Sequence, residues 1–436
     1  MASELPRRRD RGRHGIDLRR RRRGDSLRLR ARLQRLVPAD GGSGLLHAVL
    51  PDLHVHPDRA RARVPPAWTI WERRLNPLRW APKQRLERCI ALGALVLVAV
   101  WPALGLNAYW SHQIFLQTFL FGIAAASLIF LSAYGGMVSL AQTALFGIAG
   151  VIIGNLATKG GAGGTSKGLH LGWDPTVAVV VAVVMTTAIG LIFGLVAARS
   201  AGIYFLMITL TFSVIATYTL GQVTKISGFS GIGGISSYTP GWLGDVLAHP
   251  DRLYYLALGV AVAVYVLIRY IVRTPFGLSL QGVRDEPVRM SSLGYNVALH
   301  RTLAFGFAAF VASLGGILYV WWSGQIAPGN VDLPGTINLL VMAVIGGLVR
   351  IEGAWLGAFV FIVIQNYVRD FAVPGLSFGG TLFGGSFNTI VGIIFLVIVL
   401  ASPAGLMGAW DRAVAELSRR RGPPRTADEP APGPGS

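Results

Sequence analysis

The sequence predicts an all-α polytopic membrane protein with about 8–10 transmembrane helices, some broken or re-entrant, and with both termini in the cytoplasm. Of its 436 residues, 52% are hydrophobic and only 14% are charged, so a soluble protein of this size would expose too much apolar surface. Long apolar runs follow one another between residues 90 and 400, and none carries Lys, Arg, Asp or Glu in its core. Because a charge at the centre of a bilayer costs at least about 2.5–3.5 kcal/mol, this pattern is typical of membrane-spanning helices.

The individual spans follow from the length of each apolar run, since a helix needs about 20 residues to cross the hydrocarbon core. We expect spans near residues 90–106, 113–133, 137–157, 176–198, 203–220, 253–272, 302–323, 337–348, 354–368 and 387–402. The runs at 337 and 354 are short and nearly adjacent, which predicts a re-entrant or broken pair. Small residues at Gly150-x-x-x-Gly154, Gly190-x-x-x-Gly194 and Gly353-x-x-x-Gly357 should let helix backbones approach closely.

The basic residues predict the orientation of these spans. When Arg88 is placed in the cytoplasm and ten crossings alternate, most later basic residues also fall inside: Arg199, Arg269, Arg273, Arg284, Arg289, Arg301, Arg350, Arg412 and residues 419–421. Only Lys159, Lys167, Lys225, Arg252 and Arg369 fall outside. This asymmetry agrees with the positive-inside rule and predicts a multi-pass protein of the bacterial inner (plasma) membrane.

Charge also suggests three regions. Residues 1–88 hold 23 of the 40 basic and 9 of the 21 acidic residues of a chain whose net charge is +19. Arginine runs such as residues 19–23 could bind nucleic acid or anionic lipid, but no folded motif accompanies them. We therefore expect residues 1–88 to be a basic cytoplasmic extension, disordered to residue 66 and without a nucleic-acid partner, unless an incorrect start codon means that they are not made. Residues 89–408 would form the transmembrane domain in contact with membrane lipid, and residues 409–436 a disordered cytoplasmic tail.

Several kinds of chemistry are absent from the sequence. Cys89 is the single cysteine, which excludes an internal disulfide and a cysteine-based metal cluster. No G-x-x-x-x-G-K-[ST] or H-E-x-x-H motif occurs, and no Ser/His/Asp set can be assembled from the few histidines of the membrane region. We expect no enzyme activity, no catalytic residues, no metal site and no cofactor bound by this chain.

One charged segment between two spans stands out. Residues 274–301 read TPFGLSLQGVRDEPVRMSSLGYNVALHR. Asp285 and Glu286 before Pro287 suit the positive N-terminal end of a helix, and Gly294 suits a helix C-terminus. The pattern predicts one short helix across the end of the bundle, carrying Arg284, Arg289 and Met290, where a soluble partner could dock. An ordinary solvated loop is the alternative.

With this segment the chain resembles the permease subunits of branched-chain amino acid ABC importers, the LivM/LivH family, and it is closer to the LivM branch. The resemblance covers roughly residues 113–408. It rests on residues 131–150 (LSAYGGMVSLAQTALFGIAG), 202–212 (GIYFLMITLTF), 276–297, 344–357 and the closing 402–406 (SPAGL).

The resemblance implies a permease that forms the pathway for branched-chain or related amino acids. It implies a second, LivH-like permease subunit, two cytoplasmic ATP-binding subunits that use ATP and Mg, and an extracytoplasmic solute-binding protein. It implies a coupling helix near residues 284–294, formed by Arg284, Asp285, Glu286, Arg289, Met290 and Gly294. A urea or amide importer and an ion-coupled secondary transporter are the alternatives. The spans of this chain lack the intramembrane carboxylates that proton or ion coupling uses, which counts against the secondary transporter.

Polar residues inside the spans are candidates for the translocation pathway. They are Ser139, Gln142, Thr143, Thr209 and Thr211, with Gln365 and Asn366 farther along the chain. Hydrogen bonding between helices is the alternative role for each of them. Two departures from the family pattern are Ala141-Gln142 in place of Gly-His, and Arg350 and Glu352 in the turn after Gly346-Gly347. The loops 221–252, 324–336 and 369–386 are the expected docking surface for a binding protein.

Overall fold

Eight of the expected spans fall in the part of the chain that the structure describes, and each of them contains a helix. The computed structural model describes residues 109–159 and 168–370, except 245 and 247, together with 392, 396 and 405–408. The expected span at 90–106, the extension 1–88 and the tail 409–436 lie outside these residues, as does the span at 387–402 apart from 392 and 396. The helices are a π-helix η1 (Trp110–Phe115), then α4 (Leu116–Gly135), α5 (Gln142–Ala157), α6 (Pro175–Ala197), α7 (Ile203–Gln222), α8 (Pro250–Arg273), α11 (Val297–Ser323), α12 (Leu333–Gly346) and α13 (Gly353–Asp370).

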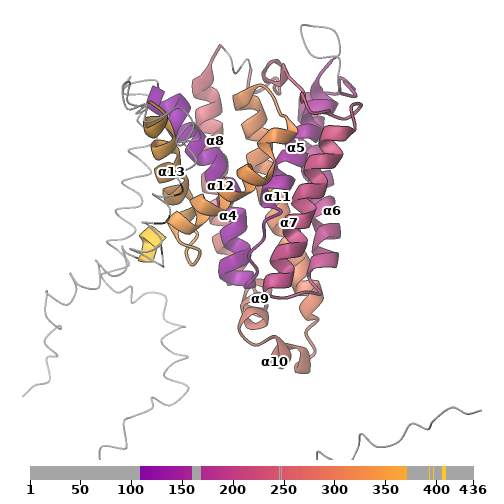
Figure 1. Ribbon diagram of the computed structural model, residues 1–436, viewed down its shortest axis with the longest axis vertical. Coiled ribbons are helices and arrows are strands. Elements are labelled where there is room, and N and C mark those ends of the chain that lie inside the picture. The colour runs from indigo at the N-terminus through magenta and orange to yellow at the C-terminus, as the bar shows by residue number, and fades with distance from the viewer. Residues whose placement is uncertain are drawn as a thin grey trace, which may run out of the picture. The chain divides into compact units, whose positions relative to one another are not determined.

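This arrangement confirms the all-α membrane fold (Figure 1). Extended pairing in the described ranges consists of the isolated bridges Lys159–Leu171 and Ile232–Ile326. Six helical stretches are long and apolar enough to cross a membrane, whereas α5 and the apolar part of α13 are shorter. The chain is therefore a multi-pass membrane protein.

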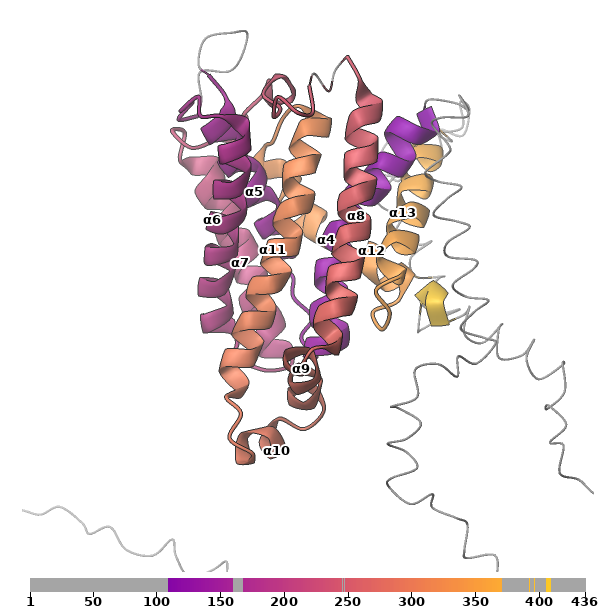
Figure 2. The ribbon, with the colours of Figure 1, turned by 180° about the vertical axis from the view of Figure 1, so that it is seen from behind.

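Two further helices, α9 (Pro275–Asp285) and α10 (Pro287–Ser292), project from one end of the bundle (Figures 1 and 2). The alternating direction of the helices places the α6–α7 turn with Arg199 at this same end. Lys159 after α5, Lys225 after α7 and Arg252 at the start of α8 lie at the opposite end. The separation of basic residues agrees with the orientation expected from the positive-inside rule, with α9 and α10 on the cytoplasmic side.

Helices α4 and α11 form the centre of the bundle. In the most apolar 18 residues of each, 89% of residues are buried for α4 and 72% for α11, whereas only 22% are buried in α6 and in α8. Glycines allow the close approach of α6 and α11: a Cβ added to Gly190 would lie 2.2 Å from the Cβ of Ala309, and one added to Gly194 would lie 3.1 Å from the carbonyl oxygen of Thr302. The sequence prediction that this small-residue pattern packs helices together is confirmed.

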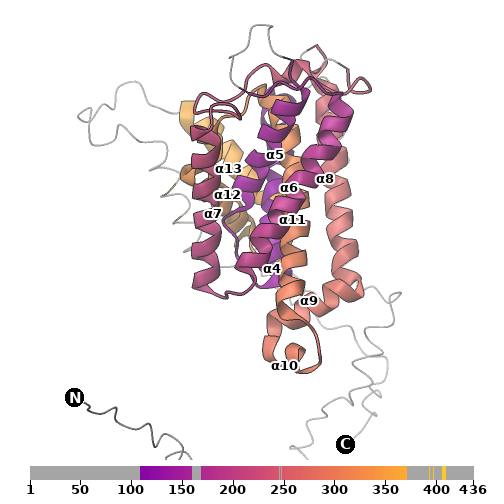
Figure 3. The same ribbon diagram turned by 90° about the vertical axis from the view of Figure 1, so that its right-hand side faces the viewer.

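The chain between α4 and α5 is not helical. Gly136 ends α4 with a positive φ of 66°, and residues 137–141 run without helical structure up to the start of α5 (Figure 3). The expectation of a helix from residue 137 is wrong, because the helix begins only at Gln142. Non-helical backbone at membrane depth needs partners inside the protein, and here the amide of Leu140 donates to Thr209 Oγ1 at 3.1 Å.

The pair of helices expected near 337 and 354, re-entrant or broken, is α12 and α13, joined by residues 347–352. The two helices cross at glycines: a Cβ added to Gly357 would lie 1.9 Å from the carbonyl oxygen of Met342. Gly405 packs on the same turn, since its Cβ would lie 2.6 Å from the backbone of Gly347. The turn and the short segment 405–408 therefore meet, although they are far apart in the sequence.

Candidate functional site

The α9–α10 segment is built by two helix starts of the same kind. Thr274 caps α9, because its Oγ1 accepts from the amide of Gly277 at 3.4 Å, and Pro275 occupies the first turn. Gly277 lets α9 fold back on α8, since a Cβ there would lie 2.3 Å from the carbonyl oxygen of Ile271. Helix α10 repeats the proline start at Pro287, as the sequence predicts.

The structure corrects the expectation of one short helix carrying Arg284, Arg289 and Met290. Arg284 lies on α9, and only Arg289 and Met290 lie on α10. Gly294 follows the end of α10 with a φ of 89°, which agrees with its expected place at a helix C-terminus. The Thr-Pro pair at 274–275 is the sequence signal from which α9 could have been predicted.

The six expected coupling residues do not all face outward. The guanidinium of Arg284 donates to the carbonyl oxygen of Ala133 in α4 and pairs with Asp285 at 2.8 Å. Met290 packs on α9, because its sulfur would lie 2.9 Å from a Cβ on Gly282. Asp285, Glu286, Arg289 and Gly294 are exposed, and the Arg284 side chain is 39% exposed beside its contact with α4.

Two exposed apolar side chains of this segment were missed by the sequence reasoning. Val288 on α10 is 76% exposed, and Leu293 just after α10 is 66% exposed. Val288 lies on α10 and Leu293 is its C-cap residue, and α10 projects from the end of the bundle (Figure 2). Apolar residues exposed outside the lipid, with Glu286 and Arg289 beside them, are typical of a surface that a protein partner covers.

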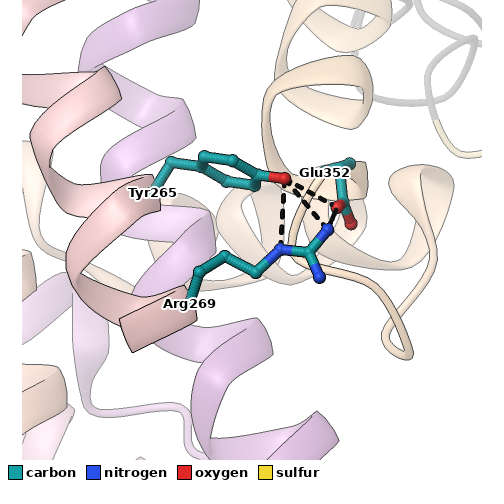
Figure 4. Close-up of polar contacts among 3 residues, drawn as sticks. All are labelled: Tyr265, Arg269 and Glu352. Atoms are coloured by element: carbon teal, nitrogen blue, oxygen red, sulfur yellow. Dashed lines mark hydrogen bonds and ion pairs between the residues drawn. The ribbon is translucent and has the colours of Figure 1, made fainter. Parts of the chain in front are cut away.

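A second polar cluster ties α8 to the α12–α13 turn (Figure 4). Arg269 forms an ion pair with Glu352, and the hydroxyl of Tyr265 donates to Glu352 Oε1 at 3.0 Å while accepting from Arg269 Nε at 3.1 Å. The guanidinium also lies over the ring of Tyr265, 5.4 Å from its centre. Glu352, one of the departures from the family pattern, is thus the residue that fastens the turn to α8.

The predicted pathway residues divide into two groups. Ser139, Gln142, Thr143 and Thr209 are buried together around the break between α4 and α5. Ser139 Oγ accepts from the amide of Ala141 at 3.2 Å, and Gln142 Oε1 lies 3.1 Å from Ser127 Oγ.

Thr211 does not join this group. It is exposed, and its hydroxyl donates to the carbonyl oxygen of Met207 in its own helix. Gln365 and Asn366 also lie elsewhere, on α13, where Asn366 accepts from the hydroxyl of Tyr109 at 3.1 Å.

Three further hydroxyls near the break were missed by the sequence reasoning. Ser213 lies 3.1 Å from Thr336 of α12, and Thr217 donates to the carbonyl oxygen of Val331 at 3.1 Å. With Thr209, these α7 residues recur every four positions and form one stripe that contacts both non-helical stretches, 136–141 and 331–332. The spacing of four is the signal from which the stripe could have been found.

The loops at the outer end are joined by backbone. Ile232 and Ile326 exchange two hydrogen bonds of 2.9 Å, linking the expected docking loops 221–252 and 324–336. Gly231 permits this, since a Cβ there would lie 2.2 Å from the carbonyl oxygen of Ile326. Most of the third expected loop, 369–386, lies outside the described residues. Among the described residues, no three His, Cys, Asp or Glu side chains gather as metal ligands.

Comparison with known proteins gives the family. The family described as "Branched-chain amino acid transport system / permease component" matches residues 112–402. LivM of Escherichia coli K12, the permease protein of a high-affinity branched-chain amino acid transport system, is 26% identical over 215 residues, which cover 44% of this chain and 50% of that protein. The probable LivM of Methanocaldococcus jannaschii is 25% identical over 247 residues, covering 53% and 67%. The probable LivH of that archaeon is 23% identical over 165 residues, covering 38% and 50%.

The chain thus spans about half the length of most of the curated relatives that it matches, and no solved structure matches it. The family match nevertheless covers well over half of the chain, including every helix from α4 to α13. The chain belongs to the branched-chain amino acid transport system permease family.

Proposed function

We propose that this chain is one of two permease subunits of an ATP-driven importer for branched-chain or related amino acids. A LivH-like subunit would be the second permease, an extracytoplasmic binding protein would deliver the solute, and two cytoplasmic subunits would bind ATP and Mg. The absence of a P-loop motif and of charges in the span cores supports an external source of energy.

The observation that carries the proposal is the exposed end of the α9–α10 segment. Val288 and Leu293 present apolar surface outside the membrane, with Glu286 and Arg289 beside them. A groove on one of the two ATP-binding subunits would bury the apolar pair and leave the charges to fix the orientation.

Movement of this segment has three routes into the bundle. The first is covalent, through Thr274 into α8 and through residues 293–296 into α11. The second is the hydrogen bond from Arg284 to Ala133 at the end of α4. The third continues from α8 through Arg269 and Glu352 to the α12–α13 turn. ATP-driven closure of the partner subunits would push α10, and these contacts would carry the displacement to the helices around the pathway.

The proposal is tested by reconstituting the two permeases, the ATP-binding subunits and the binding protein in vesicles with ATP inside. We expect uptake of labelled leucine that requires both ATP and the binding protein. The variant Leu293→Asp should lose co-purification of the ATP-binding subunits. Val349→Asp is the control, because Val349 is 74% exposed in the α12–α13 turn. Concentrative uptake by this chain alone under a proton or sodium gradient would contradict the proposal.

A further inference from the structure

The first turn of α5 holds two buried polar side chains with atoms that lack partners. The hydroxyl of Thr143 and the Nε2 of Gln142 make no hydrogen bond, although Thr143 is only 7% exposed and Gln142 is 0% exposed. Buried polar groups are rarely left unpaired, because each one loses its hydrogen bonds to water without replacement. Two consecutive residues with unpaired donors, both in the first turn of a helix, make this turn a candidate binding site.

The backbone at the same place is also incompletely paired. The first amides of a helix have no partner within the helix and need a capping side chain or water. Helix α5 begins inside the bundle after Ala141, which has no side chain able to cap it. By contrast, α12 is capped by a side chain, since Asp332 Oδ1 accepts from the amide of Gly335 at 3.0 Å. At α5, Ser139 Oγ accepts from the amide of Ala141 at 3.2 Å, and no side chain of the N-cap residue compensates the amides that follow in this 16-residue helix.

The turn packs against the non-helical stretch before α12 and is joined to α7. Thr143 shares its helix face with Gly147, where a Cβ would lie 2.1 Å from Val331 in the stretch before α12. Just before the turn, Leu140 is bonded to Thr209 of α7. Because Gln142 and Ser139 have no exposed surface, a ligand would reach the turn when α7 and the stretch around Val331 separate from α5.

We propose that the first turn of α5, with the Thr143 hydroxyl and the Gln142 amide, binds the carboxylate group of the transported amino acid. Unpaired backbone amides and a positive helix end favour an anion. The Thr143 hydroxyl and the Gln142 Nε2 in the same turn are further donors available to a carboxylate. Helices that begin at mid-membrane serve anionic substrate groups in this way in other transporter folds. The inference rests on the proposed function, because it assumes that the solute is an amino acid.

The test compares Thr143→Val with Thr143→Ser and with Thr186→Val in the reconstituted importer. Thr186 is the matched control, since its hydroxyl on α6 is likewise fully buried and without a partner. Loss of an unpaired buried hydroxyl should leave stability unchanged or slightly higher at both sites. We expect Thr143→Val to slow leucine uptake about ten-fold or more, as loss of a hydrogen bond to a charged group does. Thr143→Ser, which keeps the hydroxyl, should recover most of the uptake that Thr143→Val loses, and Thr186→Val should transport like the parent chain.

A second experiment tests whether the carboxylate is the group that is bound. The competing compound is placed inside the vesicles, because the binding protein outside could otherwise bind it. Vesicles are loaded with 4-methylpentanoate, which has the carboxylate and no amine, or with leucinol, which has the amine and no carboxylate. We expect luminal 4-methylpentanoate to slow uptake by the parent chain but not by Thr143→Val, and leucinol to slow neither. Equal responses of the two chains to 4-methylpentanoate, or equal uptake by them, would overturn the inference. Failure of the parent importer to take up leucine would instead refute the proposed function.

Discussion

Arg284 on α9 donates a hydrogen bond to the carbonyl oxygen of Ala133 at the end of α4. The contact is close, since a Cβ on Gly136, the residue that ends α4, would lie 2.4 Å from Arg284 Cγ. A guanidinium at the carbonyl end of a helix satisfies one of its unpaired acceptors and favours the negative end of the helix dipole. Arg284 thus joins the segment that projects from the bundle to a helix at the centre of the bundle.

The first prediction is that Arg284→Ala uncouples ATP hydrolysis from transport. The lost hydrogen bond to a charged donor is partly exposed, so we expect a cost of about 1 kcal/mol to the arrangement that links α9 and α4. Leucine uptake per ATP hydrolysed should fall several-fold, while the ATP-binding subunits still co-purify. The measurement is the ratio of the two rates in vesicles.

The matched control is Arg289→Ala on α10, which is exposed. Its loss should weaken binding of the ATP-binding subunits and leave the ratio of uptake to hydrolysis unchanged. An unaltered ratio in Arg284→Ala would show that the contact with Ala133 carries no movement.

The sequence was sufficient for features that depend on local chemistry. Hydropathy located the spans from α4 to α13, and the pair Glu286-Pro287 located the start of α10, because lipid solvation and helix capping act over a few neighbouring residues. The same methods missed the break at residues 136–141. Those residues are apolar enough to be part of a span, and hydropathy does not report backbone conformation.

Contacts between distant residues could not be predicted in this way. Arg269 and Glu352 are 83 positions apart, and no spacing rule connects them. Tertiary packing likewise decides which side chains of α7 are buried in the bundle. Thr209 and Thr211 both looked like pathway residues, yet two positions along a helix turn side chains to nearly opposite sides, so one of the pair had to face away.

The second prediction concerns the ion pair of Arg269 with Glu352. Glu352→Gln and Arg269→Gln should each lower the stability of the purified complex, and the double variant should lose less than the sum of the two. Both side chains are partly exposed, so we expect a coupling energy of about 0.5–1 kcal/mol. Thermal unfolding of the four proteins measures it.

Tyr265→Phe is the control for this cycle, since it removes the hydroxyl that bonds both partners and leaves the ion pair itself in place. It should be destabilised by less than either single charge variant. Strictly additive losses in the cycle would mean that the pair contributes nothing to holding the α12–α13 turn.

The third prediction compares two glycines in helices. A Cβ on Gly316 in α11 would lie 2.0 Å from the carbonyl oxygen of Phe146 in α5, which cannot move aside as a side chain could. Gly316→Ala should therefore destabilise the bundle by about 1–3 kcal/mol through overpacking. Gly259 in α8 is exposed and has nothing within 4 Å of its Cβ position. Gly259→Ala should be neutral or raise stability by up to about 1 kcal/mol.

Thermal unfolding and yield of the two alanine variants in the same detergent check this pair. Similar stability of both would mean that α5 and α11 are farther apart than the structure places them.

The fourth prediction separates the two threonines of α7. Thr209 is fully buried, and its hydroxyl accepts from the amide of Leu140 while donating to the carbonyl oxygen of Leu206 at 3.0 Å. Thr209→Val keeps the shape of the side chain and leaves the Leu140 amide without a partner, in a stretch that has no helical hydrogen bond to replace it. We expect a loss of about 1–3 kcal/mol, the cost of an unpaired buried donor. Thr211→Val removes only a hydroxyl that bonds within its own helix on an exposed face, so its stability should change little.

The measurement is thermal unfolding of the two valine variants, with amide hydrogen exchange at residues 137–141 as the local readout. Faster exchange in Thr209→Val, and unchanged exchange in Thr211→Val, is expected because the hydroxyl of Thr209 fixes the interrupted stretch to α7. Since the same stretch leads into the first turn of α5, its loosening should also slow leucine uptake. If Thr209→Val exchanges and transports like Thr211→Val, the stripe on α7 is packing alone and does not hold the break between α4 and α5.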